Sequence, residues 1–432
     1  MASIFLRYLC LMLVLSLGSL YFYAASVDIK VFKSPTGGFL EFLQIWSGIM
    51  AFAAMTVSLL LSTKLRLLNN FFGGLDKSYW LHKINGYFIA ILVLIHFTKV
   101  SGTFEKNELS LSTLHREATN LGNLLFWMII ILIAATIIKK IGKKTLLSYG
   151  AWKISHKLFI AVYLGVSFHF WAINKPYAGG SSIDNFMIIT AIVGLVSLFY
   201  RGFSTIHYFD YKISEIESND EVTKLVISPV GRKKLTPKPG QFAFLSFPKV
   251  AGKKEKHPFT IAKSDADGSL TFYIKSAGDF TSSLNENLNQ DAKVRVEGPH
   301  GKFALAKKSG RRSLWIAGGI GITPFIAFAS SNHTQTMQSS LLYVVKSRNQ
   351  VLEVDTFTKL ADANKEFNYN VIVTSEDGRP TGNTITSLIP ADCKEVDVYF
   401  CGPTSLRKSI VNILRAANIK INKMKYEVFA FR

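Results

Sequence analysis

Charged residues and cysteines are both scarce in this 432-residue chain, and each shortage excludes a class of protein. Asp, Glu, Lys and Arg make up 18% of the residues, below the roughly 25% of a typical soluble domain. Hydrophobic residues make up 49%, which excludes a disordered or fibrous chain and argues against an ordinary soluble enzyme. The 3 cysteines are too few for a disulfide framework or a zinc finger.

Acidic residues are the scarcer of the charged types. The chain has 29 of them against 50 basic residues, which gives a formal net charge of +21. Nucleic acid, an anionic membrane surface or an anionic substrate such as a dinucleotide would each fit this excess. Because long apolar runs fill the first half, we favour the membrane and the anionic substrate, and expect no nucleic-acid partner.

Six apolar stretches precede residue 210, and each approaches or reaches the ~20 residues that span a bilayer. They cover residues 4–25, 39–61, 80–100, 121–138, 154–173 and 186–204. Basic residues gather in the second and fourth loops, so these loops, both termini and the second half are predicted to be cytoplasmic. The first stretch resembles a cleaved signal peptide in part, but it is longer than a usual one, and we favour a retained helix.

Four histidines lie inside these stretches, where ionisable residues are rare and usually functional. His82 and His96 belong to the third stretch, and His156 and His169 to the fifth. Each pair is separated by roughly 20 Å along its helix. The two helices run in the same direction, so His82 is level with His156, and His96 with His169.

Two layers of paired imidazoles, one near each membrane face, suit two haems b, because His is a standard axial ligand of haem iron. Zinc fits less well, since no Cys or carboxylate joins either layer. At about 100° per residue, the spacing of the first pair returns to nearly the same helix face, and that of the second pair does not. Either the fifth helix is distorted, or its two histidines approach their haems from different directions.

The second half has the pattern of a soluble protein. Residues 223–228 and 242–247 predict antiparallel strands, within a small β-barrel from about residue 207 to 305. Further predicted strands alternate with helices, which indicates a parallel sheet with sites at the carboxyl ends of its strands. These strands cover residues 312–317, 340–346, 369–375 and 396–400.

A glycine-rich turn at residues 318–324 follows the first of these strands. Glycines let backbone N–H groups approach a phosphate, and the N-terminus of the following helix is electropositive. The pattern also occurs in plain tight turns, so its context matters. Residues 401–403 and 347–348 end two other strands of the same predicted sheet, and all three segments would meet at one edge.

With these motifs in order, the chain resembles the transmembrane flavocytochrome family of NADPH oxidases and ferric reductases over nearly its whole length. It is most similar to the compact bacterial NADPH oxidases, also in the stretch from Leu75 to Lys83. The two histidine pairs match the family's haem ligands, unequal spacing included. The resemblance implies a six-span helical domain, a ferredoxin-reductase-like module, and FAD, NADPH and two haems b as cofactors.

The resemblance also carries flavin-binding roles to two segments. Residues 257–260 match a flavin motif, although related soluble reductases have Arg in place of His257. Residues 278–281 match a second one, where Phe280 replaces a common Trp. The implied FAD-binding residues are His257, Pro258, Phe259, Thr260, Lys275, Gly278, Phe280 and Thr281.

The nucleotide-binding roles follow in the same way. We expect the Arg348 guanidinium, helped by Arg379, to pair with a 2′-phosphate and to favour NADPH over NADH. Glu427 and Phe429 resemble a C-terminal Glu-x-aromatic motif whose ring covers the flavin; Phe429 is then the catalytic candidate, and Phe431 a competitor. The implied NADPH-binding residues are Gly318, Gly319, Gly321, Thr323, Pro324, Ser347, Arg348, Arg379, Cys401, Gly402 and Pro403.

The implied activity is electron transfer from NADPH through FAD and two haems to an acceptor outside the membrane. Oxygen, giving superoxide, is favoured over ferric chelates because the outer loops offer iron only Glu105, Glu108, His115 and Glu117. A conduit to a partner protein or quinone is a third reading, and no obligate protein partner is expected.

The expected domains are a transmembrane haem domain at residues 1–206, an FAD-binding β-barrel at 207–308 and an NADPH-binding α/β domain at 309–432. The expected location is the plasma membrane of a bacterial-type cell, with the flavin and nucleotide domains cytoplasmic.

Overall fold

The computed structural model divides the chain into two compact units, residues 1–206 with 430–432 and residues 207–429. We describe each unit by itself. The structure describes residues 2–26, 38–98, 113–138, 140–141, 144–145, 149–173, 179–204, 208–219, 221–248, 255–276, 279–282, 284, 288–305, 311–331 and 337–427.

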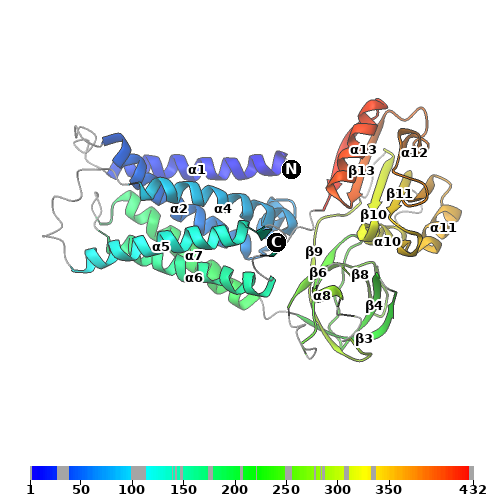
Figure 1. Ribbon diagram of the computed structural model, residues 1–432, viewed down its shortest axis with the longest axis horizontal. Helices are drawn as coiled ribbons and strands as arrows, with labels where there is room; N and C mark the ends of the chain where they lie inside the picture. Colours follow the sequence, from blue (N-terminus) through cyan, green and yellow to red (C-terminus); the bar gives the residue numbers. More distant parts are fainter. Residues whose placement is uncertain are drawn as a thin grey trace. The chain divides into compact units, whose positions relative to one another are not determined.

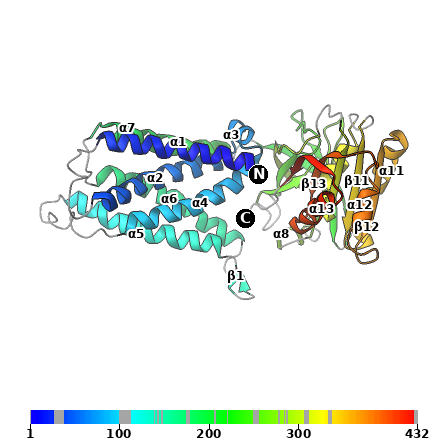
Figure 2. The ribbon, with the colours of Figure 1, turned by 90° about the horizontal axis from the view of Figure 1, so that it is seen from above.

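The first unit is a bundle of long helices that lie side by side (Figures 1 and 2). Each of the six predicted apolar stretches coincides with one of them. They are α1 (Ala2–Ser26), α2 (Gly38–Ser62), α4 (Leu75–Phe97), α5 (Thr113–Ile137), α6 (Tyr149–Ala172) and α7 (Ser182–Ser204). Short elements join them: α3 (Arg66–Phe71), β1 (Lys140–Ile141) and β2 (Lys144–Thr145).

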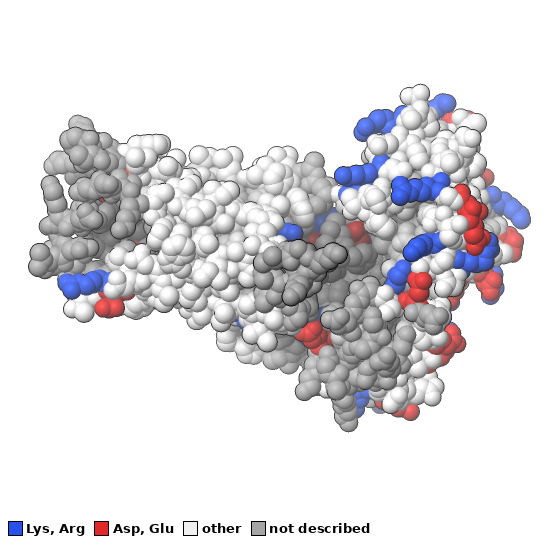
Figure 3. Space-filling model, in the orientation of Figure 1, with Lys and Arg blue, Asp and Glu red and all other residues white. Residues whose placement is uncertain are grey.

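The bundle has the surface of a membrane protein. Among the described residues, 5 helices are long and apolar enough to cross a bilayer: α1, α2, α4, α5 and α7. The 24 residues of α6 match them in length, but its lysines and histidines lower its hydropathy. Large apolar side chains such as Val14, Ile131 and Phe199 are more than 60% exposed, and the visible face carries few charges along its middle (Figure 3).

The second unit begins with a seven-stranded antiparallel sheet in the order β6-β5-β9-β3-β4-β8-β7. The edge strands β6 and β7 follow each other in the chain, separated by Ile261 and Ala262. A sheet whose two edges are joined by so short a link must curl until the edges adjoin (Figure 1). The strands are β3 (Phe209–Ser218), β4 (Val222–Pro229), β5 (Phe242–Ser246), β6 (His257–Thr260), β7 (Lys263–Ser264), β8 (Leu270–Lys275) and β9 (Lys293–His300).

A five-stranded parallel sheet follows, in the order β12-β11-β10-β13-β14. The order reverses between β11 and β13 on either side of β10, and in such sheets ligands bind beside the carboxyl ends of the strands at the reversal. The strands are β10 (Ser313–Gly318), β11 (Ser339–Val345), β12 (Phe367–Val373), β13 (Glu395–Cys401) and β14 (Lys420–Tyr426). The helices are α8 (Asp279–Ser282), η3 (Gly319–Ile322), α10 (Thr323–Ala329), η5 (Arg348–Gln350), α11 (Val354–Ala363), α12 (Gly382–Thr386) and α13 (Thr404–Ala416).

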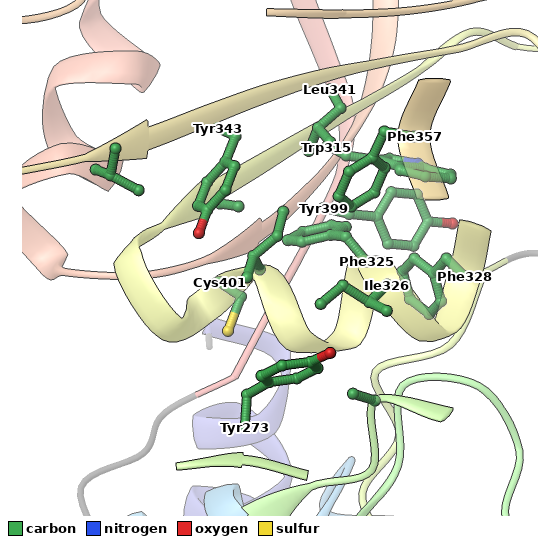
Figure 4. Close-up of a cluster of buried hydrophobic side chains, with 14 of the residues drawn as sticks. Tyr273, Trp315, Phe325, Ile326, Phe328, Leu341, Tyr343, Phe357, Tyr399 and Cys401 are labelled. Atoms are coloured by element: carbon green, nitrogen blue, oxygen red, sulfur yellow. The ribbon is translucent and has the colours of Figure 1, made fainter. Parts of the chain in front are cut away.

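One hydrophobic core joins the two sheets of this unit. Tyr273 and Phe303 of the antiparallel part are buried in the same cluster as Trp315, Phe325 and Phe328 of the α/β part. Figure 4 shows α10 lying between the parallel strands and Tyr273. The two parts therefore form a single compact body, which holds their ligand-binding edges in a fixed relation.

Candidate functional site

The histidines at one end of the helical unit face each other. The ring centroids of His82 on α4 and His156 on α6 lie 5.9 Å apart, with an angle of 67° between the ring planes. A metal bound by two imidazoles lies about 2 Å from each nitrogen, and the separation of the rings is compatible with one metal atom between them. His96 near the end of α4 and His169 near the end of α6 are the other predicted pair.

Three of the four histidines are held by backbone carbonyls through Nδ1. His82 Nδ1 lies 3.1 Å from the Ser58 oxygen, His96 Nδ1 lies 2.9 Å from that of Gln44, and His169 Nδ1 lies 2.8 Å from that of Ala118. A carbonyl accepts from an N–H, so each Nδ1 carries the proton and Nε2 keeps its lone pair. This tautomer is the one that binds a metal through Nε2.

The unequal spacing on α6 also has an explanation. The helix runs from Tyr149 to Ala172 without interruption, so His156 and His169 project in different directions from a regular helix. Of the two alternatives left by the sequence, the structure favours different directions of approach over a distorted helix.

A buried polar network, which the sequence analysis did not identify, lies behind His82. Asn85 is fully buried and donates to the Ala54 carbonyl at 2.7 Å and to the Ser58 hydroxyl at 2.8 Å. Tyr8 of α1 donates to the Asn85 side chain at 2.7 Å. The network connects three helices to the residue whose carbonyl orients His82. The signal available in the sequence was an Asn within an apolar stretch, about one helical turn after a histidine.

The predicted flavin segment is the edge strand β6. Thr260, which is buried, pairs with Phe242 of β5, and Pro258 is tolerated because an edge strand lacks a partner on one side. The His257 ring stacks on Phe280 at 3.7 Å between centroids, and its Nε2 lies 3.6 Å from the Glu255 carboxylate. The two predicted flavin segments are thus in contact. Phe259 and Thr281 are half-buried, and Gly278 lies outside the described residues.

Lys275, the predicted flavin residue that lies outside these two segments, is at the end of β8 and lies 3.5 Å from the Glu221 carboxylate. Glu221 also accepts from Gln350 of the α/β part. Lys275 therefore lies beside a polar link between the two parts of the unit.

The glycine-rich turn and the segment from Cys401 to Pro403 are packed backbone to backbone. A Cβ on Gly318 would lie 2.7 Å from the Pro403 ring, and a Cβ on Gly321 would overlap the Cys401 carbonyl. Gly319 differs, because it has a φ of +55° and open space where its Cβ would be. Gly318 and Gly321 therefore bring two strand ends together, and Gly319 leaves room for a ligand. Thr323 and Pro324 begin α10 and are buried.

The segment after β11 places Arg348 at the same edge of the sheet. Its guanidinium forms an ion pair with Glu376 at 2.5 Å, and both side chains are exposed. This contact, with the charge of Glu376, raises the pKa of Arg348. The Ser347 hydroxyl donates to Asn349 at 2.6 Å, and Arg379 is exposed in the loop after β12. A phosphate at Arg348 has to compete with Glu376.

Glu427 follows β14 and is buried beside Gly301 and Phe242. Burial, and then the charge of Glu427, raises the pKa of the Cys401 thiol well above its usual range. Phe242 pairs with Thr260 of the flavin segment, so Glu427, which follows the edge strand of the parallel sheet, lies near the strand that holds that segment. Phe429 and its competitor Phe431 lie outside the described residues.

Two protein families match the chain, one in each unit. Residues 47–167 match the ferric reductase like transmembrane component, and residues 210–307 match an FAD-binding domain. The first match contains His82, His96 and His156 and ends at residue 167, just before His169, and the second contains all but the first residue of the curled sheet.

Individual proteins also match parts of the chain. The chain is 28% identical over 218 residues to a probable electron transfer subunit of dihydroorotate dehydrogenase B from Thermococcus kodakarensis, covering 50% of this chain and 85% of the relative. It is 23% identical over 248 residues to the heavy chain of a superoxide-generating NADPH oxidase from Dictyostelium discoideum, covering 43% of this chain and 35% of that protein.

A solved structure, the flavohemoglobin of Malassezia yamatoensis, aligns over 94% of this chain and 100% of its own with a TM-score of 0.50 at 17% identity, a similarity of fold alone. The chain is a multi-pass membrane oxidoreductase whose transmembrane component and FAD-binding domain match the NADPH oxidase and ferric reductase flavocytochrome family.

Proposed function

We propose that the chain carries electrons across a membrane, from cytoplasmic NADPH through FAD and two haems b to an acceptor outside. The observation that supports this most directly is the set of four histidines at two levels, three of them with Nδ1 on a backbone carbonyl. The proposed domains are residues 1–206 for haem, 207–308 for FAD and 309–432 for NADPH. We place the protein in a bacterial-type plasma membrane, with the last two domains cytoplasmic.

The cofactors supply the redox chemistry: hydride donation by the nicotinamide and electron transfer by FAD and haem. The protein supplies binding and orientation. The open backbone at Gly319 and the N-terminus of the following helix suit a pyrophosphate. His257, stacked on Phe280, presents a ring nitrogen where related reductases have Arg.

The histidines act by presenting one nitrogen each. His82 with His156, and His96 with His169, would hold one haem iron per pair through Nε2, while the carbonyls of α2 and α5 fix the rings. No group of three or more metal-binding side chains occurs among the described residues. Each predicted level has two histidines, which is the number of axial ligands that one haem iron takes.

Oxygen, reduced to superoxide, is the acceptor we favour. Ferric chelates would need recognition on the outer surface, and the predicted outer loops carry only Glu105, Glu108, His115 and Glu117 for this purpose. Ferric-chelate reduction is the alternative activity. Transfer to a partner protein or quinone is a third, which the nucleotide-binding features make less fitting.

The test is a steady-state assay on the purified chain. NADPH consumption is measured with and without oxygen, with superoxide-specific and ferrous-iron detection in parallel. Oxygen-dependent consumption with superoxide formation is expected, and consumption that requires only a ferric chelate would favour the alternative. Two haems per FAD are expected. His96→Ala and His169→Ala should each remove one and leave flavin reduction intact, and a single haem in the wild type would contradict the proposal.

A further inference from the structure

We propose that Gly48 and Gly122 are positioning residues for the haem that His96 and His169 would hold, which we call the outer haem. Each glycine leaves the space in which one of these two histidines lies. The inference rests on the proposed function, since it concerns how His96 and His169 are presented to iron. It adds two residues to the site that neither contact iron nor belong to the motifs of the resemblance.

The first glycine faces His96. A Cβ on Gly48 would lie 2.5 Å from His96 Nδ1 and 2.6 Å from its Cε1. No side chain fits there without moving the ring. The same nitrogen lies 2.9 Å from the carbonyl of Gln44, one helical turn before Gly48 on α2. The ring is thus seated over the glycine, with Nδ1 directed at the preceding turn.

The second glycine repeats this arrangement on another helix. A Cβ on Gly122 of α5 would lie 2.6 Å from His169 Cε1 and 2.9 Å from its Nδ1. His169 Nδ1 lies 2.8 Å from the carbonyl of Ala118, again one turn before the glycine. Two helix pairs, α2 with α4 and α5 with α6, therefore present their outer histidines in the same way.

The spacing lets the carbonyl and the glycine act on the same ring. Residues four apart lie on the same face of a helix, so the carbonyl and the glycine address one ring together. The carbonyl fixes which nitrogen carries the proton, and the missing Cβ leaves the space that the ring occupies beside that carbonyl. Glycine weakens a helix interior relative to alanine, so two glycines at these equivalent places call for a local reason.

The level of His82 and His156, the inner layer, lacks this combination of a carbonyl and a glycine, so the arrangement is specific to the outer layer. His82 lies 3.1 Å from the Ser58 carbonyl, but the residue four positions later is Ser62, the last of α2. Crowding the outer rings by an added methyl group should therefore disturb the outer haem and spare the inner one.

The experiment compares Gly48→Ala and Gly122→Ala in the full-length purified chain. The haem-to-FAD ratio is measured from the pyridine haemochrome spectrum, and the haem midpoint potentials by optical redox titration. Each variant should lose one of its two haems, or keep both with the potential of one shifted and its absorption band altered. The affected haem should be the one that His96→Ala removes.

Gly18→Ala is the matched control, because Gly18 lies within α1 and has no atom within 4 Å of its added Cβ. This variant should keep both haems and both potentials. Unchanged haem content and unchanged potentials in Gly48→Ala and Gly122→Ala would overturn the inference, and so would loss of both haems together, or of a different haem in each. A wild type without two haems would instead overturn the proposed function.

Discussion

At the scale of single residues, cofactor choice depends on an exposed ion pair. Arg348→Ala should raise the KM for NADPH on the order of tenfold and leave that for NADH nearly unchanged, because only NADPH has a phosphate for the guanidinium to bind. Glu376→Gln should act in the opposite direction, since it releases Arg348 from its partner at 2.5 Å. Steady-state kinetics with both nucleotides measure the two effects.

Arg379→Ala is the comparison variant, because Arg379 is the second arginine predicted at the 2′-phosphate and is exposed in the loop that also carries Glu376. It should change the KM for NADPH less than Arg348→Ala does. Equal changes for NADPH and NADH in the Arg348 variant would show that another residue recognises the 2′-phosphate.

The network behind His82 gives a second prediction at this scale. Asn85→Leu removes the partner of the Tyr8 hydroxyl, the Ser58 hydroxyl and the Ala54 carbonyl, and buried polar groups left unpaired lose about 1–3 kcal/mol each. We expect a lower melting temperature of the purified protein and a shifted potential of the haem proposed at His82 and His156. Tyr8→Phe, which removes one hydrogen bond, should have the same effects to a smaller degree.

At the scale of elements, the sequence predicts whatever depends on hydrophobic pattern. The six apolar stretches and the strands β4, β5, β10, β11, β12 and β13 all appear near their predicted places. The start of α4 was predicted at residue 80 and lies at Leu75, because the first turn carries Asp76 and Lys77, which hydropathy excludes from a membrane stretch. β14 was not predicted, since lysines interrupt its apolar residues at a sheet edge.

The candidate site likewise has features that the sequence predicts and features that it does not. The histidines and the glycine turn were visible because their chemistry resides in side chains or in missing ones. The carbonyls of Gln44, Ser58 and Ala118 carry no sequence signal, since every residue has one. The ion pair of Arg348 with Glu376 joins two loops whose proximity depends on the sheet order.

The two packed turns of the parallel sheet give a prediction for an element pair. Gly321→Ala should force the glycine turn away from Cys401 and raise the KM for the nucleotide, because its Cβ has no space. Gly382→Ala is a control for glycine removal, since a Cβ on Gly382 meets nothing within 4 Å and its φ is not in the left-handed region. FAD content should remain unchanged in both. Nucleotide binding that is equally weak in both variants would show that close packing of the turns is not what matters.

At the scale of the second unit as a whole, Glu353 ties the two sheets together. Its carboxylate accepts from Lys263 at 2.8 Å and from Tyr273, both in the antiparallel part. Burial favours the neutral acid, but hydrogen bonds from Lys263, Thr356 and Tyr273 outweigh it and hold the pKa of Glu353 below its usual value. The contact stabilises the unit above the usual carboxyl pKa of about 4.3, and this stability is lost as the pH falls through the lowered pKa.

Glu353→Gln should therefore destabilise the protein at neutral pH by about 1–3 kcal/mol and flatten the acid side of its stability profile. Heat-induced release of FAD, followed by fluorescence between neutral and acidic pH, measures this. Glu376→Gln, which removes an exposed carboxylate, should leave the profile nearly unchanged. A Glu353 variant with the wild-type profile would show that the contact does not stabilise the unit.

The two-residue link between β6 and β7 fixes the register at which the curled sheet closes. The strands on either side of Ile261 and Ala262 are paired with different neighbours, β5 and β8, so the length of the link sets the offset at which the first and last strands meet. Successive side chains on a strand point to opposite faces. One residue inserted there would invert the side chains of β6 or β7, and in β6 would turn the proposed flavin contacts towards the core. Homologous FAD-binding domains should therefore tolerate inserted residues in many of their loops, but not in the link between β6 and β7.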